Sequence, residues 1–276
     1  MTSPASTEQR AFRDFEHAGW KQAAGGYHDH IASLTSQAVP SLLDAVGVRK
    51  GTVLLDGCTG PGDAAGAAAD RGARATGMDF SAPMIALACR RFPQAMFLVG
   101  DAEELPFRKE SFDAVVSNFG VLHLTRPEQF LREAHRVLRP GGLVAFTVWA
   151  PQEDAVGFAI VHHAIQAHGN PAVPLPPGPP FFRFSDSSEC LRTFRSAGFA
   201  DSEVLRVPQQ WRLKDPDGVF QAMIAGTVRT GGLLRAQTPE ALAAIRDAMR
   251  GAVERHRRED GFEIPMPAVV ASAVKP

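Results

Sequence analysis

The stretch GTVLLDGCTGPGD, residues 51–63, decides the fold of this chain. Its apolar run ends at Asp56, and the loop that follows contains three glycines: Gly57, Gly60 and Gly62. An Ala-rich segment comes next, so the stretch predicts a buried strand, a tight turn and a helix N-terminus. In parallel α/β sheets such a turn lies at the carboxyl end of the first strand, where nucleotide-like ligands bind.

The glycine spacing alone is compatible with a dinucleotide enzyme, a methyltransferase or a purely structural turn. The dinucleotide pattern G-x-G-x-x-G, read from Gly60, requires a third glycine where this chain has Ala65. Alanine replaces that glycine in some dinucleotide sites, so the spacing favours the other two interpretations without deciding between them.

Composition limits the classes of function. The 276 residues suffice for one α/β domain with insertions, and 29 basic against 30 acidic residues give a net charge of −1. Nucleic-acid binding normally needs a basic excess, so no nucleic-acid partner is expected. The N-terminus has no apolar signal core, and the apolar runs are too short to span a bilayer, so we expect a cytoplasmic protein. The three cysteines lack metal-ligand spacing, and no metal or disulfide framework is expected: Cys58, Cys89 and Cys190.

Strand-like and helix-like segments alternate after the glycine loop. Strands are expected at 52–56, 74–79, 95–99, 112–118 and 143–149, and helices at 62–71, 82–91 and 127–138. This alternation predicts a doubly wound, mostly parallel sheet. Parallel crossovers bring the strand carboxyl ends to one edge, and four polar residues stand there: Asp56, Asp79, Asp101 and Asn118.

The rest of the chain is less regular. Residues 1–17 are expected to be a loose lead-in, and the segment PAVPLPPGPPFFRF is too rich in proline to be helical. Helices are expected at 151–170 and 186–197, a strand at 202–207, mostly helix at 215–258 and a final strand at 268–271.

The polar strand ends suit an adenosine-containing ligand. Asp79 can accept hydrogen bonds from both ribose hydroxyls, and its alternative is to cap the next helix. Asp101 can accept from an adenine amino group while the backbone N–H of Ala102 donates to a ring nitrogen. Phe80 and Met84 offer apolar surface to the adenine, or are ordinary core.

Five motifs, taken in order, resemble one family. LLDGCTGPG, GMDFSAPMIALA, GDAEELPF, FDAVVSNFGVLH and RVLRPGG, within residues 51–149, are similar to the motif series of class I S-adenosylmethionine (SAM)-dependent methyltransferases. The resemblance is greatest to the ubiquinone/menaquinone C-methyltransferase group, also called methyltransferase type 11. Cys58 stands where that family usually has its first loop glycine. RVLRPGG would place a turn at 140–142 before the fifth strand.

The resemblance implies a fold and a division of the chain. The fold is Rossmann-like, with seven strands, the last antiparallel, an N-terminal helical lid and inserted helices. The implied parts are the lid at 1–47, a SAM-binding core at 48–150, a helix with a Pro-rich cap loop at 151–184, more core at 185–207, an inserted helical cap at 208–260 and the last core strand at 261–276.

The resemblance also implies roles for individual residues. Within the loop that includes Gly57 and Cys58, Gly60 and Gly62 would let the backbone approach the methionine part of SAM, and Asp56 would hold its amino group. Asp79 would bind the ribose, and Asp101 with Ala102 the adenine. Backbone at the methionine end would come from Asn118 and Phe119, and the lid would direct two rings at the sulfonium: Trp20 and Tyr27.

The chemistry demands little more than positioning, since a sulfonium methyl is already activated. His123 is the best candidate for a general base, and its alternative is a structural, ring-stacking histidine. Phe181, Phe182 and Arg183 are expected at the pocket of a small, partly hydrophobic acceptor, or as anchors of a long loop. A SAM-binding protein without methyl transfer and an NAD-dependent oxidoreductase remain alternatives. The pattern leaves open a monomer or a homodimer, and attack by oxygen, nitrogen or carbon.

Overall fold

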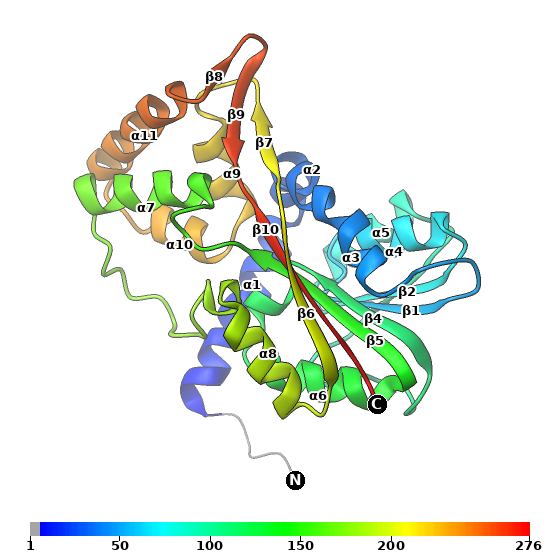
Figure 1. Ribbon diagram of the computed structural model, residues 1–276. Helices are drawn as coiled ribbons and strands as arrows, with labels where there is room; N and C mark the ends of the chain where they lie inside the picture. The colour runs from blue at the N-terminus through cyan, green and yellow to red at the C-terminus, as the bar shows by residue number, and fades with distance from the viewer. Residues whose placement is uncertain (1–5) are drawn as a thin grey trace. The chain divides into compact units, whose positions relative to one another are not determined.

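The computed structural model describes residues 6–276, which form two compact units (Figure 1). The helical unit comprises the described chain up to Leu34, Ala150–Gly178 and Pro208–Pro267. The sheet unit comprises Thr35–Trp149, Pro179–Val207 and Ala268–Pro276. This division differs from the expected parts: residues 35–47 and 179–184 belong to the sheet unit, and residues 261–267 belong to the helical unit.

The sheet unit is built on seven strands in the order β3-β2-β1-β4-β5-β10-β6. All neighbouring pairs are parallel except those of β10, which runs antiparallel to β5 and β6. The predicted doubly wound sheet with an antiparallel last strand is therefore confirmed. The strands are β1 (Val53–Gly57), β2 (Arg74–Asp79), β3 (Met96–Val99), β4 (Phe112–Asn118), β5 (Leu138–Trp149), β6 (Ala200–Val207) and β10 (Ala268–Val274).

Helices cover both faces of this sheet, α3, α4 and α5 on one side and α6 and α8 on the other (Figure 1). Leu54 and Leu55 alternate between the faces of β1, and both are completely buried because each face is covered. The bounds are α3 (Val39–Ala45), α4 (Asp63–Asp70), α5 (Ala82–Arg91), α6 (Pro127–Val137) and α8 (Ser187–Ser196), with short 3-10 turns η1 (Ser36–Ala38), η2 (Val121–His123) and η3 (Arg183–Ser185).

The fifth strand begins earlier than expected. Residues 140–142, predicted as a turn, lie inside β5, and the register with β4 shifts near their level. Lys275 holds them in place: its carbonyl accepts from the Gly141 N–H at 2.8 Å, and its own N–H donates to the Gly142 carbonyl at 2.8 Å. Gly141 has a φ of +76°, which only glycine adopts readily, so the ladder continues through the bend.

The helical unit contains α1 (Thr7–His30), α7 (Val156–His168), α9 (Gly218–Gly226), α10 (Arg229–Arg235) and α11 (Pro239–Glu254), while α2 (Ala32–Thr35) spans the chain boundary between the units. Residues 1–5 lie outside the described part, but from Thr7 onward the expected loose lead-in is wrong. A capping box starts α1 there: Ser6 Oγ accepts from the Gln9 N–H, and the Gln9 side chain accepts from the Ser6 N–H.

A small antiparallel sheet in the helical unit was not predicted. Its order is β7-β9-β8, with β7 (Gln210–Leu213), β8 (Arg257–Arg258) and β9 (Gly261–Pro265). Trp211 and Ile264 are paired in register and almost completely buried, and they anchor this sheet. Strands of two to five residues are too short for alternation to reveal them in sequence.

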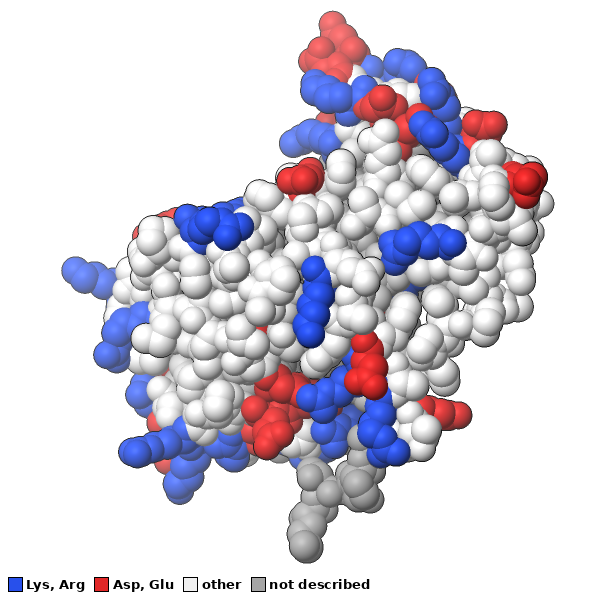
Figure 2. Space-filling model, turned by 180° about the vertical axis from the view of Figure 1, so that it is seen from behind, with Lys and Arg blue, Asp and Glu red and all other residues white. Residues whose placement is uncertain are grey.

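Two surface properties of the described residues bear on function. None of the helices between residues 6 and 276 is long and apolar enough to cross a membrane. On the face shown in Figure 2, basic and acidic side chains lie close to one another, so the charge on that face is mixed.

Candidate functional site

Asp56 lies at the carboxyl end of β1 and is almost completely buried. Its Oδ2 accepts from the Thr59 hydroxyl at 2.5 Å and from the Ala65 N–H at 3.1 Å. Its Oδ1 is buried and has no hydrogen-bond partner among residues 6–276. A buried carboxylate oxygen without a donor is costly, so Oδ1 is an acceptor position prepared for a donor such as an ammonium group.

Asp79, at the end of β2, joins two loops at the same edge. Its Oδ2 accepts from the Gly60 N–H and its Oδ1 from the Ser81 N–H, both at 2.9 Å. Two carboxylate oxygens offer about four acceptor positions, so each oxygen keeps capacity for a further donor. The side chain therefore fixes both loops and keeps acceptor capacity, while the N-cap of α5 is Ser81 and not Asp79. Its role toward a ribose stays a prediction.

Burial raises the pKa of both carboxyl groups. Loss of hydration is the main cause and lifts the pKa of Asp56 from 3.8 to about 7, against the lowering effect of its hydrogen bonds. The pKa of Asp79 rises to about 6 for the same reason. Burial, reinforced by nearby carboxylates including Asp79, also raises the pKa of the Cys58 thiol. The ionised forms of both carboxyl groups are therefore costly in the unliganded fold, and a cationic partner would stabilise them.

The loop glycines have different physical roles. Gly60 has a φ of +52°, and a Cβ there would meet nothing within 4 Å, so open space lies over it. A Cβ on Gly62, where φ is +89°, would lie 2.9 Å from Ala88 Cβ. A Cβ on Gly57 would lie 2.8 Å from the Phe130 ring. Gly60 thus leaves room for a ligand, while Gly57 and Gly62 permit helix packing.

The loop after β3 contains the residues that are expected to contact adenine. Asp101 is half-buried, and its Oδ1 accepts from the Glu103 N–H at 2.8 Å, while Ala102 is buried. Glu103, which the sequence analysis missed, accepts from the Arg126 backbone and guanidinium at 2.8 Å each and so fixes this loop. Two apolar residues that are candidate neighbours of the adenine follow β2. Phe80 is half-buried, and Met84 is buried.

The end of β4 carries the fourth polar strand end. Asn118 is half-buried, and Phe119 after it has a φ of +54°, an uncommon conformation for an aromatic residue. The Phe119 ring packs on Trp149 with 4.1 Å between centroids. Thr147, which the sequence analysis also missed, hydrogen-bonds to both residues. Its only signal in the sequence is one hydroxyl within the apolar run of β5.

An aromatic cluster follows this turn in the sheet unit. His123, the last residue of η2, meets Phe181 edge-on at 5.9 Å, and Phe181 meets Phe182 at 5.1 Å. Arg183 was expected at the acceptor pocket or as an anchor of the long loop, and its guanidinium contacts Glu128 and Glu189 at 2.6 Å each. Arg183 therefore connects η3 to α6 through Glu128 and to α8 through Glu189.

Trp20 and Tyr27 lie on α1 in the helical unit, with edge-to-face rings 5.5 Å apart. The Trp20 indole N–H donates to Glu16 at 2.9 Å, and Glu16 also pairs with Arg229 at 3.0 Å. These contacts anchor Trp20 within its own unit. The role of Trp20 and Tyr27 toward a sulfonium stays a prediction.

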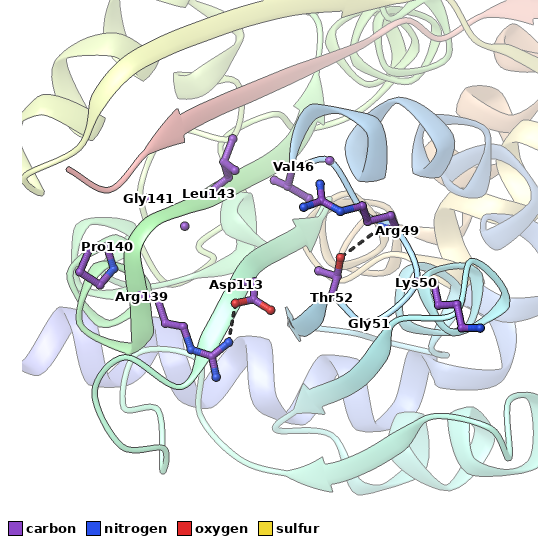
Figure 3. Close-up of a pocket in the computed structure, with 12 residues that line it drawn as sticks. Val46, Arg49, Lys50, Gly51, Thr52, Asp113, Arg139, Pro140, Gly141 and Leu143 are labelled. Atoms are coloured by element: carbon purple, nitrogen blue, oxygen red, sulfur yellow. Dashed lines mark hydrogen bonds and ion pairs between the residues drawn. The ribbon is translucent and has the colours of Figure 1, made fainter.

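A cavity of about 500 Å³ in the sheet unit lies at the opposite edge of the sheet (Figure 3). It is lined by residues before β1 and at the start of β4 and β5, including Arg49, Asp113 and Arg139. Arg139 pairs with Asp113 across its floor (Figure 3). This cavity is separate from the glycine loop, which follows the carboxyl end of β1. Within residues 6–276, no group of three or more His, Cys, Asp or Glu is placed to hold a metal ion.

The region of the chain that contains the glycine loop is similar to known proteins. Residues 55–146 match the family model described as a methyltransferase domain. A demethylmenaquinone methyltransferase of Beutenbergia cavernae is 41% identical over 121 residues, covering 42% of this chain and 50% of that protein. A malonyl-[acyl-carrier protein] O-methyltransferase of Pseudescherichia vulneris is 37% identical over 133 residues, covering 48% and 53%. The chain spans about half the length of the curated relatives it matches.

Solved structures share the fold across nearly the whole chain. Phosphoethanolamine N-methyltransferase 2 of Haemonchus contortus, in complex with S-adenosyl-L-methionine, has a TM-score of 0.57 at 19% identity, covering 99% of this chain and 61% of that one. The [4+2]-cyclase SpnF has a TM-score of 0.55 at 20% identity, covering 100% and 99%. At these identities the likeness establishes the fold.

Proposed function

We propose that this chain, whose residues 55–146 form a class I SAM-dependent methyltransferase domain of the menaquinone and ubiquinone methyltransferase group, moves a methyl group from SAM to a small, partly hydrophobic acceptor. The observation that carries the proposal is the edge shared by Asp56 and Asp79. Asp56 keeps a buried oxygen without a donor, and Asp79 holds the loop over which Gly60 leaves space. SAM has an ammonium, a ribose and a compact sulfonium chain to satisfy these features.

Three of the polar strand ends then have specific roles in binding SAM. Asp56 Oδ1 accepts from the ammonium group, and the spare acceptor positions of Asp79 take the ribose hydroxyls. Asp101 accepts from the adenine amino group while the Ala102 N–H donates to the ring. The bound cofactor supplies an activated methyl group, so the protein mainly orients the donor and excludes water.

The acceptor site in the sheet unit is proposed at the aromatic cluster of His123, Phe181 and Phe182. The relatives' names, demethylmenaquinone and malonyl-[acyl-carrier protein] methyltransferases, supply two acceptor chemistries to test: a quinone ring carbon and a carboxylate oxygen. The test is incubation with methyl-labelled SAM and each acceptor, followed by mass analysis of the product. Label in an acceptor supports methyl transfer, whereas tight SAM binding without transfer to any acceptor class favours the non-transferring alternative.

That alternative has one observation in its favour. The same fold, over the full length of this chain, occurs in a protein named as a [4+2]-cyclase, so the fold does not by itself require methyl transfer. A SAM-binding protein that transfers no methyl group would still bind the ribose through Asp79. Replacing His123 would not reduce its activity.

His123→Ala is expected to lower turnover about a hundredfold with little change in SAM affinity, if the acceptor must lose a proton during attack. The matched control is His135→Ala, because His135 meets Phe199 edge-on at 5.1 Å within the same unit. Single-turnover rates measured with labelled SAM distinguish the two. Unchanged turnover in His123→Ala would remove the base and leave the ring contact with Phe181 as its role.

The two glycines at the loop should separate binding from stability. Gly60→Ala is expected to weaken SAM binding about tenfold and to destabilise the protein by only about 1–2 kcal/mol, since its Cβ enters open space. Gly62→Ala should cost about 1–3 kcal/mol more, because its Cβ meets Ala88 and Phe97. Urea unfolding and calorimetric titration measure both quantities. A larger stability loss in Gly60→Ala than in Gly62→Ala would contradict this assignment.

A further inference from the structure

Thr147 sits at the centre of a hydrogen-bond chain behind the proposed cofactor site. It is completely buried in β5, in register with Asn118 of β4. Its Oγ1 lies 2.8 Å from the Phe119 nitrogen and 2.7 Å from Asn118 Oδ1. Asn118 Nδ2 in turn lies 3.1 Å from the Thr35 carbonyl oxygen. All four residues belong to the sheet unit.

The direction of every bond in this chain is fixed by its two ends. A backbone N–H only donates, so Thr147 Oγ1 accepts from Phe119 and its own hydrogen is free to donate. A backbone carbonyl only accepts, so the Asn118 amide presents its NH₂ group to Thr35 and its oxygen to Thr147. The Phe119 N–H therefore donates to Thr147 Oγ1, and the Thr147 hydroxyl donates to Asn118 Oδ1. Asn118 Nδ2–H donates to the Thr35 carbonyl oxygen. Only a hydroxyl can both accept and donate at the Thr147 position.

The segment held by this chain is strained and lies against the glycine loop. Phe119 has a φ of +54°, which disfavours a bulky side chain unless its surroundings impose it. A Cβ on the next residue, Gly120, would lie 2.4 Å from Cys58 Cβ. The turn 118–120 therefore touches the loop directly, and a small shift of the turn displaces Cys58.

We propose that Thr147 is a positioning residue for the cofactor site: its hydroxyl sets the conformation of the 118–120 turn and, through Cys58, of the glycine loop. The inference rests on the proposed function, because it assumes that this loop holds SAM. Thr147 is buried behind the turn and acts through Asn118 and Phe119. The Phe119 N–H also reaches the Thr147 carbonyl at 3.2 Å, a bond that substitution of the side chain leaves in place.

The test compares a hydroxyl deletion with a hydroxyl-retaining variant. Thr147→Val keeps the shape and removes both side-chain bonds, while Thr147→Ser keeps the bonds. We expect S-adenosylhomocysteine affinity, measured by calorimetry, to fall about tenfold in Thr147→Val, the size associated with one net hydrogen bond, and to stay within about twofold in Thr147→Ser. Thr193→Val is the control, because the buried Thr193 hydroxyl bonds to the Glu189 carbonyl within α8.

Thermal unfolding of each variant distinguishes positioning from general support. Lower melting temperature with unchanged affinity in Thr147→Val would overturn the proposal, as would equal losses of affinity in Thr147→Val and Thr147→Ser. If Thr147→Val does not fold, Thr147→Ala against Thr147→Ser poses the same question, since both lack the methyl group and only one lacks the hydroxyl. Absence of S-adenosylhomocysteine binding in the unmodified protein would instead contradict the proposed function.

Discussion

Asp79→Ala is expected to weaken SAM binding by about a hundredfold or more. Two hydrogen bonds from ribose hydroxyls to a carboxylate are lost, each worth about 1.5 kcal/mol, and about 1.4 kcal/mol corresponds to a factor of ten. The Gly60 and Ser81 N–H groups also lose their acceptor, so the loop is no longer held in place. Calorimetric titration with SAM and S-adenosylhomocysteine measures the effect.

A matched control exists in the same unit. The Asp186 side chain accepts from the Ser188 N–H at 2.8 Å, just as the Asp79 side chain accepts from the Ser81 N–H. Asp186 differs in that it is the exposed N-cap residue of α8. Asp186→Ala should therefore bind SAM as the unmodified protein does. Equal affinity in Asp79→Ala and Asp186→Ala would show that Asp79 does not contact the cofactor.

The second large effect concerns stability and pH. Raising the pKa of Asp56 from 3.8 in the unfolded chain to about 7 in the fold corresponds to about 4 kcal/mol. Between those two values the native state holds a proton that the unfolded chain has released. In the absence of cofactor, the contribution of Asp56 to the free energy of unfolding is therefore fully present below about pH 4. This contribution is lost as the pH rises through about 7.

Asp56→Asn removes this dependence, because an amide is neutral at every pH. Urea unfolding at pH 5 and pH 8 should show a fall in stability of several kcal/mol for the unmodified protein and a smaller fall for Asp56→Asn. Asp79, with its pKa at about 6, contributes in the same direction in both proteins. Parallel pH profiles for the two proteins would contradict the buried, raised state of Asp56.

The same pKa values carry a consequence for binding. An ammonium ligand pairs with ionised Asp56, so SAM affinity should strengthen as the pH rises from 6 to 8. The ionised Asp56 carboxylate, which destabilises the unliganded protein at neutral pH, is therefore the group that pairs with the ammonium of SAM.

The sheet and its polar edge could be predicted from sequence because they depend on local patterns. Apolar runs that end in Asp56, Asp79 and Asn118 determine both the strands and the edge at which they meet. The glycine loop was equally readable, although Gly62 turned out to serve packing against Ala88 and not only access for a ligand.

Features that depend on distant partners could not be read in this way. Arg183 resembles a free cation in sequence, yet Glu128 and Glu189 neutralise it through contacts across three elements. Thr147 looks like a β-branched strand residue, and its role appears only when β4 lies beside it. The small sheet around Trp211 follows the same rule for β7, which pairs with β9 across about fifty residues.

Calorimetric titration of the unmodified protein with SAM, S-adenosylhomocysteine and NADH determines which cofactor the carboxyl edge of the sheet binds. We expect micromolar binding of the two SAM-type ligands at pH 8, weaker binding at pH 6, and no binding of NADH. Binding of NADH without binding of either SAM-type ligand would contradict the assignment and every residue role derived from it.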